Sequence, residues 1–269
     1  GLTSRHQFCS RANKFKMMEI NKIYNENCMD TMRRMPDNFV DLTITSPPYN
    51  MKLRVHSGKY QNIGTSPSAN ADYRTKYSDF ADCLPIEDFY KLHSEIVTEL
   101  LRVSKIIFYN ISIVAGSKRA FFKIIGEYSD FVKEIIIWDK GHGEPAISPG
   151  VLNRQSELII VFDNSTAINR TFYKCNFDRG TLSDVWKIAR GKKISKDHGA
   201  VFPEELVQKI IENFSDEGDL IYDPFMGTGT TGNVASLYKR NYIGSEISKN
   251  YCKVAEERIW NPLLELIKH

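Results

Sequence analysis

The sequence predicts an α/β fold in which a mostly parallel, twisted sheet is covered by helices on both faces. The first observation behind this prediction is that short runs of β-branched and aromatic residues alternate along the chain with longer amphipathic segments, as is typical of βαβ units. The second is size, because 269 residues that are 42% apolar can fill one large α/β domain or two small ones.

Each element has a local signal. The helix at 85–103 opens on a proline, which suits a first helical turn, and repeats apolar residues along one face. A second helix opens on Pro203, and Pro36 ends a short one. Strands are expected at 20–27, 41–45, 105–114, 132–138, 157–162, 220–222 and 241–244, and helices at 31–35, 85–103, 117–128 and 203–214, with a last one ending near 238.

Two stretches lack a regular pattern. Residues 140–149 are expected to form a loop, and the segment after 163 is irregular and ends in basic residues near 187–196 that suit phosphate contact or a solvated face. Residues 51–80 mix Ser, Gly, Asn and Tyr with basic residues, which predicts a long structureless loop. Its tyrosines and basic residues suit phosphate contact and base stacking, so this loop is either a lid or a solvated mobile loop.

A rigid turn follows the strand at 41–45, with the sequence Ser46-Pro47-Pro48-Tyr49. Two prolines fix the backbone and supply no N–H, so this segment can join neither a helix nor a sheet ladder. Its carbonyl oxygens and aromatic ring suit a flat group with N–H donors, such as the amino group of a nucleobase. A Pro-Pro turn is also common in ordinary loops, so the turn alone does not decide the function.

A glycine turn, DPFMGTGTT, occupies residues 223–231 between a strand and a helix. Gly227 and Gly229 allow a tight turn and close approach of the backbone to a ligand, and the threonines after them are expected to cap the helix. The turn contains no Walker lysine. A methionine-tailed adenosine fits it better than a pyrophosphate, with the amino group near Asp223 and the carboxylate near backbone N–H groups.

An acidic residue, Glu246, follows the next strand, about twenty residues after the turn. A carboxylate in this position can accept hydrogen bonds from both hydroxyls of a ribose. The glycine turn alone is weak evidence for a nucleoside cofactor. Together with the acid and the Ser-Pro-Pro-Tyr turn it predicts a site for a nucleoside cofactor beside a site for an amino group.

Three motifs together resemble the amino-methyltransferases of DNA: TSPPYN at 45–50, DPFMGTGTT at 223–231 and SEIS at 245–248. The catalytic motif precedes the cofactor motif, which is similar to the β-class permutation. The resemblance extends to YNENCMD at 24–30 and HGAVFP at 198–203, and so covers nearly the whole chain from about 19 to 260.

This resemblance implies a circularly permuted, Rossmann-like methyltransferase fold that uses S-adenosylmethionine to methylate a flipped base in double-stranded DNA. It implies that Asp30 contacts the cofactor's adenine, that Phe202 lines the pocket and that a small target-recognition region lies at 140–197. Phe225 packs either under the adenine or in the core. The cofactor-binding residues expected are Asp30, Phe202, Asp223, Phe225, Gly227, Gly229, Thr230 and Glu246.

The expected catalytic residues are Ser46, Pro47, Pro48 and Tyr49. Hydrogen bonds from the amino group to the serine hydroxyl and the Pro47 carbonyl would free the nitrogen lone pair, while the tyrosine ring stacks on the base. The chain has no Pro-Cys nucleophile, which argues against methylation at carbon 5 of cytosine. Many adenine-N6 members carry Asp where this chain has serine, so cytosine N4 is favoured and adenine N6 is the alternative.

Rival functions remain open. One is methylation of RNA or of a protein glutamine, and another is an inactive nucleic-acid-binding module with a methyltransferase fold. A homodimer and a cognate restriction endonuclease are expected partners by resemblance only. The net charge of +3 permits nucleic-acid binding without requiring it.

Composition narrows the remaining classes. No apolar run approaches the roughly 20 residues of a membrane span and no signal peptide is visible, so a cytoplasmic protein is expected. The five scattered cysteines predict reduced thiols and no metal site. Residues 1–18 are expected to form a disordered tail, or a basic arm that touches DNA, ahead of a methyltransferase domain at 19–269.

Isolated histidines and tryptophans are assigned ordinary roles. His56, His93 and His142 have no metal-ligand spacing and are expected on the surface or in loops. Trp138 and Trp186 are expected to belong to the core or to a pocket wall rather than to stack on a base.

Overall fold

The computed structural model describes residues 18–50, 53–56, 59–62, 84–144, 149–165, 170–191 and 202–260, with the backbone alone at 53–56 and 59–62. Nearly all of the expected tail at 1–18, most of the expected lid and the first four residues of HGAVFP lie outside this part of the chain.

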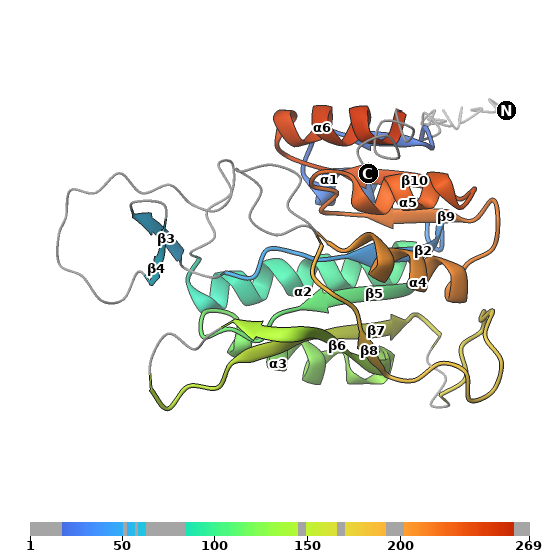
Figure 1. The fold of residues 1–269 in the computed structure, drawn as a ribbon. Coiled ribbons are helices and arrows are strands. Elements are labelled where there is room, and N and C mark those ends of the chain that lie inside the picture. The colour runs from blue at the N-terminus through green and yellow to red at the C-terminus, as the bar shows by residue number, and fades with distance from the viewer. Residues whose placement is uncertain are drawn as a thin grey trace, which may run out of the picture.

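One eight-stranded sheet forms the centre of the molecule (Figure 1), in the order β1-β10-β9-β2-β5-β7-β6-β8. β7 runs antiparallel to both of its neighbours, and every other pairing in this sheet is parallel. The mostly parallel sheet expected from the sequence is therefore confirmed. Its strands are β1 (Lys22–Tyr24), β2 (Val40–Thr45), β5 (Ser104–Ile111), β6 (Val132–Glu144), β7 (Arg154–Asp163), β8 (Val185–Lys187), β9 (Leu220–Asp223) and β10 (Asn241–Ser245).

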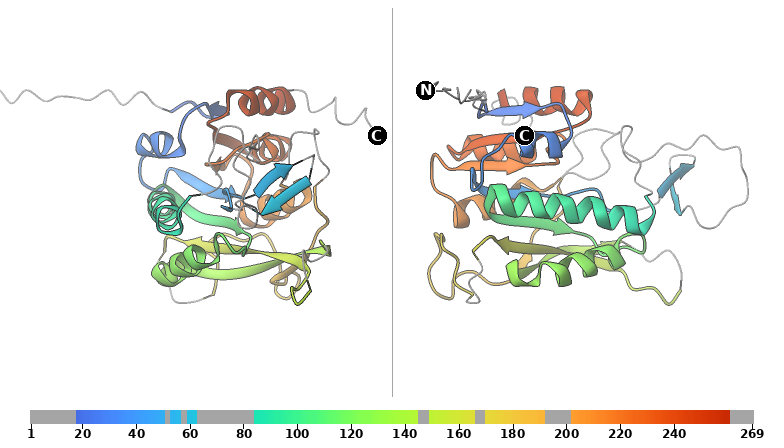
Figure 2. Two further views of the ribbon diagram at one scale, coloured as in Figure 1. Left: turned by 90° about the vertical axis from the view of Figure 1, so that its left-hand side faces the viewer. Right: turned by 180° about the vertical axis from the view of Figure 1, so that it is seen from behind.

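Helices cover both faces of the sheet, as Figure 2 shows in its end-on view. One face carries α1 (Cys28–Arg33), α2 (Ile86–Val103) and α3 (Lys118–Glu127), with the 3-10 turn η1 (Ser129–Phe131) after α3; the other carries α4 (Glu204–Phe214), α5 (Thr230–Leu237) and α6 (Lys249–Trp260). Successive residues of a strand alternate between these two cores. In β5, Phe108 packs towards α4–α6 and Tyr109 towards α1–α3, and both are buried.

The chain order creates a crevice between β2 and β9, which are neighbours in the sheet. After β2, the chain crosses through α2 on one face to reach β5. After β9, it crosses through α5 on the other face to reach β10. Connections that leave adjacent parallel strands in opposite directions open a crevice at their carboxyl ends, where α/β proteins bind ligands. The Ser-Pro-Pro-Tyr turn follows β2, and the glycine turn follows β9.

Two expectations about irregular segments are wrong. β6 continues to Glu144 through residues expected to form a loop, because antiparallel pairing with β7 reaches the register Glu144↔Arg154. The segment 51–80 contains a two-stranded hairpin, β3 (Leu53–His56) and β4 (Lys59–Asn62), which stands apart from the main sheet in Figure 1. The segment 140–197, besides its loops, supplies β7 and β8 of the main sheet.

His93 is buried rather than exposed, which corrects the expectation for this residue. It lies on the inner face of α2, where its Nδ1 makes a hydrogen bond with the Tyr109 hydroxyl. Burial lowers the pKa of His93 to about 3, so the ring is neutral and structural. Trp138 and Trp186 are buried, as expected, and His142 is exposed.

Three further findings concern the cysteine thiols, the length of the helices and the absence of a metal-binding group among the described residues. The thiols of Cys28, Cys175 and Cys252 are free. Among the described residues, the helices are all too short or too polar to cross a bilayer, and no group of His, Cys, Asp and Glu side chains is placed to hold a metal ion.

Candidate active site

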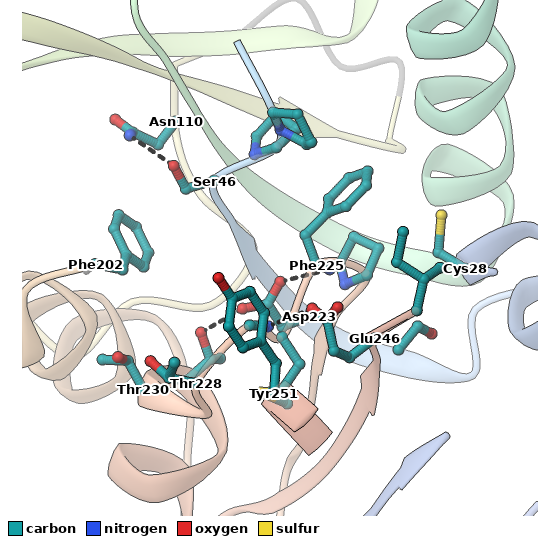
Figure 3. Close-up of a pocket in the computed structure, with 18 of the residues that line it drawn as sticks. Cys28, Ser46, Asn110, Phe202, Asp223, Phe225, Thr228, Thr230, Glu246 and Tyr251 are labelled. Atoms are coloured by element: carbon teal, nitrogen blue, oxygen red, sulfur yellow. Dashed lines mark hydrogen bonds between the residues drawn. The ribbon is translucent and has the colours of Figure 1, made fainter. Parts of the chain in front are cut away.

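A pocket lies at the carboxyl edge of the sheet, across the crevice between β2 and β9 (Figure 3). Its walls come from residues that follow parallel strands, namely the turn after β2, the glycine turn after β9 and Glu246 after β10. The start of α1, residues of α2 and of β5–β7, Phe202 and Tyr251 complete it. Because parallel strands all end at this edge, segments nearly two hundred residues apart in the sequence meet here.

Most of the residues predicted for the site line this one pocket. They are Ser46, Pro47, Pro48, Tyr49, Phe202, Asp223, Phe225, Gly227, Thr230 and Glu246. The structure thus brings the two sequence motifs together on adjacent strands. Asp30 and Gly229 do not line the pocket, and each has a different environment.

Asp223 is a buried carboxylate at the end of β9 that organises the glycine turn. Its Oδ1 accepts hydrogen bonds from Thr45 Oγ1 (2.9 Å) and the Phe225 backbone N–H (3.0 Å), and its Oδ2 accepts one from Thr231 Oγ1 (2.6 Å). Burial raises the pKa of Asp223 to about 6, although all three hydrogen bonds favour the ionised form. Thr45 belongs to β2, so Asp223 also joins the two halves of the site.

Glu246 holds the other side of the glycine turn. Its Oε2 accepts a hydrogen bond from the Gly227 N–H (2.9 Å), and its Oε1 accepts one from the Ser248 N–H (2.8 Å). A carboxylate has about four lone-pair sites, so these two bonds leave it capacity to accept hydrogen bonds from a ligand. The backbone contacts fix its orientation at the pocket wall.

The helix after the glycine turn is not capped by a threonine, contrary to expectation. Gly229 is the N-cap of α5, with φ of 84°, and no side chain caps the helix. The Thr231 hydroxyl instead donates to Asp223. Gly229 faces α6 rather than the pocket, because a Cβ on it would lie 2.7 Å from the Ala255 Cβ and 2.9 Å from its Cα.

We expect Gly229→Ala to lower the free energy of unfolding by about 3 kcal/mol, roughly 1 for the left-handed backbone and 2 for overlap with Ala255. Gly227→Ala is the matched control. Gly227 also has positive φ, but a Cβ there would meet only the Phe225 carbonyl at 3.8 Å, so a loss of about 1 kcal/mol is expected. Chemical denaturation of both variants checks this, and equal losses would contradict the packing role assigned to Gly229.

Asp30 does not reach the pocket, so the role expected for it in adenine contact is not supported. It is exposed on α1, where Oδ1 pairs with Arg33 Nη1 at 2.7 Å. Helix α1 starts at Cys28 and turns Asp30 towards solvent. Glu26 and Asn27, which precede the helix, line the pocket instead, and the Asn27 side chain caps α1 by accepting from the Met29 N–H at 2.9 Å.

A hydrogen-bonded cluster surrounds the Ser-Pro-Pro-Tyr turn and includes residues that the sequence did not single out. The Ser46 and Tyr49 hydroxyls are 2.6 Å apart. Asn110, from β5, points to Ser46 in Figure 3, with its Nδ2 3.3 Å from Ser46 Oγ. The same Nδ2 lies 2.6 Å from the Tyr49 hydroxyl and 2.8 Å from Glu157 Oε2. Glu157, from β7, pairs with Lys140 of β6. The one signal in the sequence was a polar asparagine inside an apolar strand.

Aromatic rings form part of the pocket wall. Phe202, Phe225 and Tyr251 lie around it in Figure 3. Phe202 packs edge-on against Trp138, whose indole N–H donates to the Ile188 carbonyl at 2.8 Å. Trp138 is thus a wall residue, as expected. Such rings offer flat surfaces for a heterocycle.

The remaining polar residues have supporting roles. Asn50, with φ of 53°, donates from Nδ2 to the Leu84 and Gly116 carbonyls and thereby anchors the Ser-Pro-Pro-Tyr turn to the segments before α2 and α3. Cys28 lines the pocket, but burial raises the pKa of its thiol to about 12, so it is protonated and a poor nucleophile.

Residues 40–257 match the family model of the N6/N4 DNA methylases, from the first residue of β2 to the middle of α6. The chain belongs to the N6/N4 DNA methylase family. The matched span contains the turn after β2, the glycine turn and Glu246. Every residue that lines the pocket lies within the matched span, except those at the start of α1.

Known proteins resemble this methylase along most of its length. The Type II methyltransferase M.BglII of Bacillus subtilis is 27% identical over 277 aligned positions, which cover 90% of this chain and 69% of that protein. The solved structure titled PvuII DNA methyltransferase (cytosine-N4-specific) superposes with a TM-score of 0.63 at 15% identity, covering 88% of this chain and 85% of that one. The M1.HpyAVI–SAM complex superposes with a TM-score of 0.58 at 20% identity, covering 88% and 98%. These structures show that the fold is that of Rossmann-like methyltransferases.

The residues of the pocket fit S-adenosylmethionine by the chemistry of their side chains. Among the described residues that line the pocket there is no lysine or arginine, and besides Glu157, which is paired with Lys140, there are three carboxylates, from Glu26, Asp223 and Glu246. This balance suits a ligand that carries a sulfonium and an ammonium group. The aromatic wall suits its adenine, and Glu246 suits its ribose hydroxyls.

Proposed function

We propose that this methylase transfers a methyl group from S-adenosylmethionine to the exocyclic amino group of a base flipped out of double-stranded DNA, with cytosine N4 as the preferred acceptor. One observation carries the proposal. The Ser46 hydroxyl and the carboxylates of Asp223 and Glu246 line one pocket across the crevice between β2 and β9. An acceptor for an amino group therefore lies beside groups suited to the cofactor.

The cofactor-binding roles follow from the side chains. Glu246 would accept hydrogen bonds from the ribose, Asp223 would face the ammonium group, and Phe225 would pack on the adenine. We assign the edge of the adenine to Glu26 and Asn27, in place of Asp30. When bound, S-adenosylmethionine supplies an electrophilic methyl carbon on its sulfonium.

The catalytic turn would hold the base. An amino nitrogen on a heterocycle is a poor nucleophile, because its lone pair is delocalised into the ring. Ser46 Oγ and the Pro47 carbonyl would accept hydrogen bonds from the two N–H groups and so turn the lone pair towards the methyl carbon. The Pro-Pro backbone keeps these acceptors rigid, which lowers the cost of positioning the base.

The preference for cytosine rests on Ser46 alone, since the structural neighbour named as cytosine-N4-specific is only 15% identical. A neutral serine stands where many adenine-N6 members of the family carry aspartate. Adenine N6 is the alternative acceptor, because both bases present the same pair of N–H donors to the turn.

Target recognition is assigned to the loops within 140–197. The Type II relatives favour a partner endonuclease, and a homodimer is expected.

The affinity for S-adenosylmethionine should depend on pH through Asp223. Its raised pKa of about 6 means that the carboxyl gains a proton as the pH falls through that value, which removes the negative charge facing the ammonium group. We expect calorimetric titrations between about pH 7.5 and pH 5 to show progressively weaker binding. Asp223→Asn should bind weakly across that range with much less pH dependence.

The raised pKa of Asp223 affects the stability of the ligand-free protein in the opposite direction from its effect on cofactor binding. Because the pKa of Asp223 in the folded protein lies above its ordinary value of 3.8, Asp223 contributes stability that is fully present below pH 3.8 and is lost as the pH rises through about 6. Weaker binding at low pH therefore cannot come from unfolding caused by this carboxyl. An affinity for S-adenosylmethionine that is the same at about pH 7.5 and pH 5 would contradict the placement of Asp223 at the ammonium group.

A direct test offers methyl-labelled S-adenosylmethionine together with double-stranded DNA, RNA or a glutamine-containing peptide in parallel. Label in DNA alone is the expected result. Label in RNA or peptide would establish one of the rival acceptors. Bound cofactor with no transfer to any of the three would identify an inactive binding module.

A further inference from the structure

We infer that Glu157 is the proton acceptor of the reaction and acts on the base through Tyr49 and Ser46. The inference rests on the proposed function and assigns a role to residues of β5–β7 that the sequence motifs do not contain. It also answers a chemical question raised by Ser46. A neutral hydroxyl can accept a hydrogen bond from the amino group, but it cannot retain the proton that methylation releases.

The carboxylate lies one hydroxyl away from the catalytic serine. The Tyr49 hydroxyl donates to Glu157 Oε2 at 3.0 Å and lies 2.6 Å from Ser46 Oγ. Asn110 Nδ2 lies within 2.8 Å of both the Tyr49 hydroxyl and Glu157 Oε2, so it holds the two groups together. Glu157 also lines the pocket itself.

The directions of these hydrogen bonds are fixed by the carboxylate. An ionised carboxylate only accepts, so the single proton of the Tyr49 hydroxyl points to Glu157. Ser46 must then donate its own proton to the Tyr49 oxygen, because the two hydroxyls are 2.6 Å apart and the tyrosine has no second proton. Ser46 Oγ accepts a hydrogen bond from Asn110 Nδ2 at 3.3 Å with one lone pair, and the other is the one to which the amino group would donate.

Lys140 is the ion-pair partner of Glu157. Its Nζ lies 3.0 Å from Glu157 Oε1, on the oxygen that Tyr49 does not use. The side chains of Lys140 and Glu157 are only 6% and 13% exposed, so the pair is shielded from solvent. The attraction between the two side chains is therefore little screened by salt.

The proton balance closes within these residues. The amino nitrogen forms a bond to the methyl carbon, and the electron pair of the broken carbon–sulfur bond remains on sulfur. One N–H proton passes to Ser46 Oγ, the serine proton passes to the Tyr49 oxygen, and the tyrosine proton passes to Glu157 Oε2. Both hydroxyls end as they began, and the protonated Glu157 returns its proton to solvent after the methylated base leaves.

A second buried pair between the same strands provides a matched control. Lys133 of β6 and Asp163 of β7 lie 3.7 Å apart, with side chains 4% and 2% exposed, and neither lines the pocket. This pair lies at the other end of β6 and β7. Substituting it also removes a buried charge pair from the sheet, but does not touch the catalytic turn.

The test compares Glu157→Gln, Tyr49→Phe, the double variant and Asp163→Asn by single-turnover methyl transfer to DNA at saturating cofactor. Tyr49→Phe keeps the ring for stacking, and it tests the relay even if Glu157→Gln folds poorly. We expect Glu157→Gln and Tyr49→Phe each to slow methyl transfer by at least about tenfold. This loss is smaller than the one typical for removal of a group that exchanges a proton directly with the substrate, because here the proton moves through two hydroxyls. The double variant should be no slower than the slower single variant, since both break one path.

Two binding measurements separate a proton path from general damage. Glu157→Gln should keep its affinities for S-adenosylmethionine by calorimetry and for DNA by fluorescence anisotropy within about twofold of wild type. Asp163→Asn should unfold at a lower temperature but transfer methyl at the wild-type rate. Wild-type rates in both Glu157→Gln and Tyr49→Phe would overturn the inference alone, whereas a wild-type protein that methylates no DNA would overturn the proposed function and the inference with it.

Discussion

Ser46→Ala will slow methyl transfer to DNA by about 100-fold while the affinity for S-adenosylmethionine stays within about twofold of wild type. The serine hydroxyl is placed to accept a hydrogen bond from the amino group of the base, so its loss affects the nitrogen in the transition state. It does not contact Asp223 or Glu246, which are assigned to the cofactor. Single-turnover kinetics and calorimetry measure the two effects separately.

Ser94→Ala provides the control for this substitution. Ser94 also makes hydrogen bonds with a tyrosine hydroxyl, that of Tyr128, but it lies on α2 outside the pocket lining. Its variant should transfer methyl at the wild-type rate. Full activity in Ser46→Ala would show that the base is held by other groups, and a parallel loss of cofactor affinity would show that the serine is a binding residue instead.

The second large effect is expected from Asp223→Ala, which should weaken S-adenosylmethionine binding by at least about 10-fold. The substitution removes the carboxylate assigned to the ammonium group. It also leaves three buried donors without their acceptor, those of Thr45, Thr231 and the Phe225 backbone. The free energy of unfolding should therefore fall by about 2 kcal/mol.

Asp219→Ala separates these two consequences. Asp219 lies just before the same strand, β9, and pairs with Lys174 at 2.6 Å, away from the pocket. This variant should lose stability without a change in cofactor affinity. If Asp223→Ala bound S-adenosylmethionine like wild type, the assignment of the glycine turn to the methionine end of the cofactor would have to be abandoned.

The parts of the site that the sequence predicted are those determined by local chemistry. Two prolines must end a strand wherever it lies, and glycines with an acid one strand later define a turn without knowledge of the rest of the fold. The order of these segments, together with alternating strands and helices, was enough to predict the mostly parallel sheet. The pocket between β2 and β9 follows from that topology.

The parts that the sequence missed depend on long-range register or on side-chain direction. Glu157 reaches Tyr49 only because β7 inserts antiparallel between β5 and β6, a pairing that no local pattern specifies. The resemblance implied that Asp30 contacts the adenine, but α1 begins at Cys28 and directs Asp30 to solvent. His93 looked polar and exposed, whereas its position on α2 falls on the buried face.

The most direct measurement is the identity of the methylated nucleoside after the protein has acted on unmethylated genomic DNA with labelled S-adenosylmethionine. Digestion to nucleosides and mass spectrometry locate the methyl group. We expect N4-methylcytosine. N6-methyladenine would retain the mechanism and reverse the base preference drawn from Ser46, whereas 5-methylcytosine, or no methylated nucleoside at all, would contradict the claim that the Ser-Pro-Pro-Tyr turn presents an amino group for methylation.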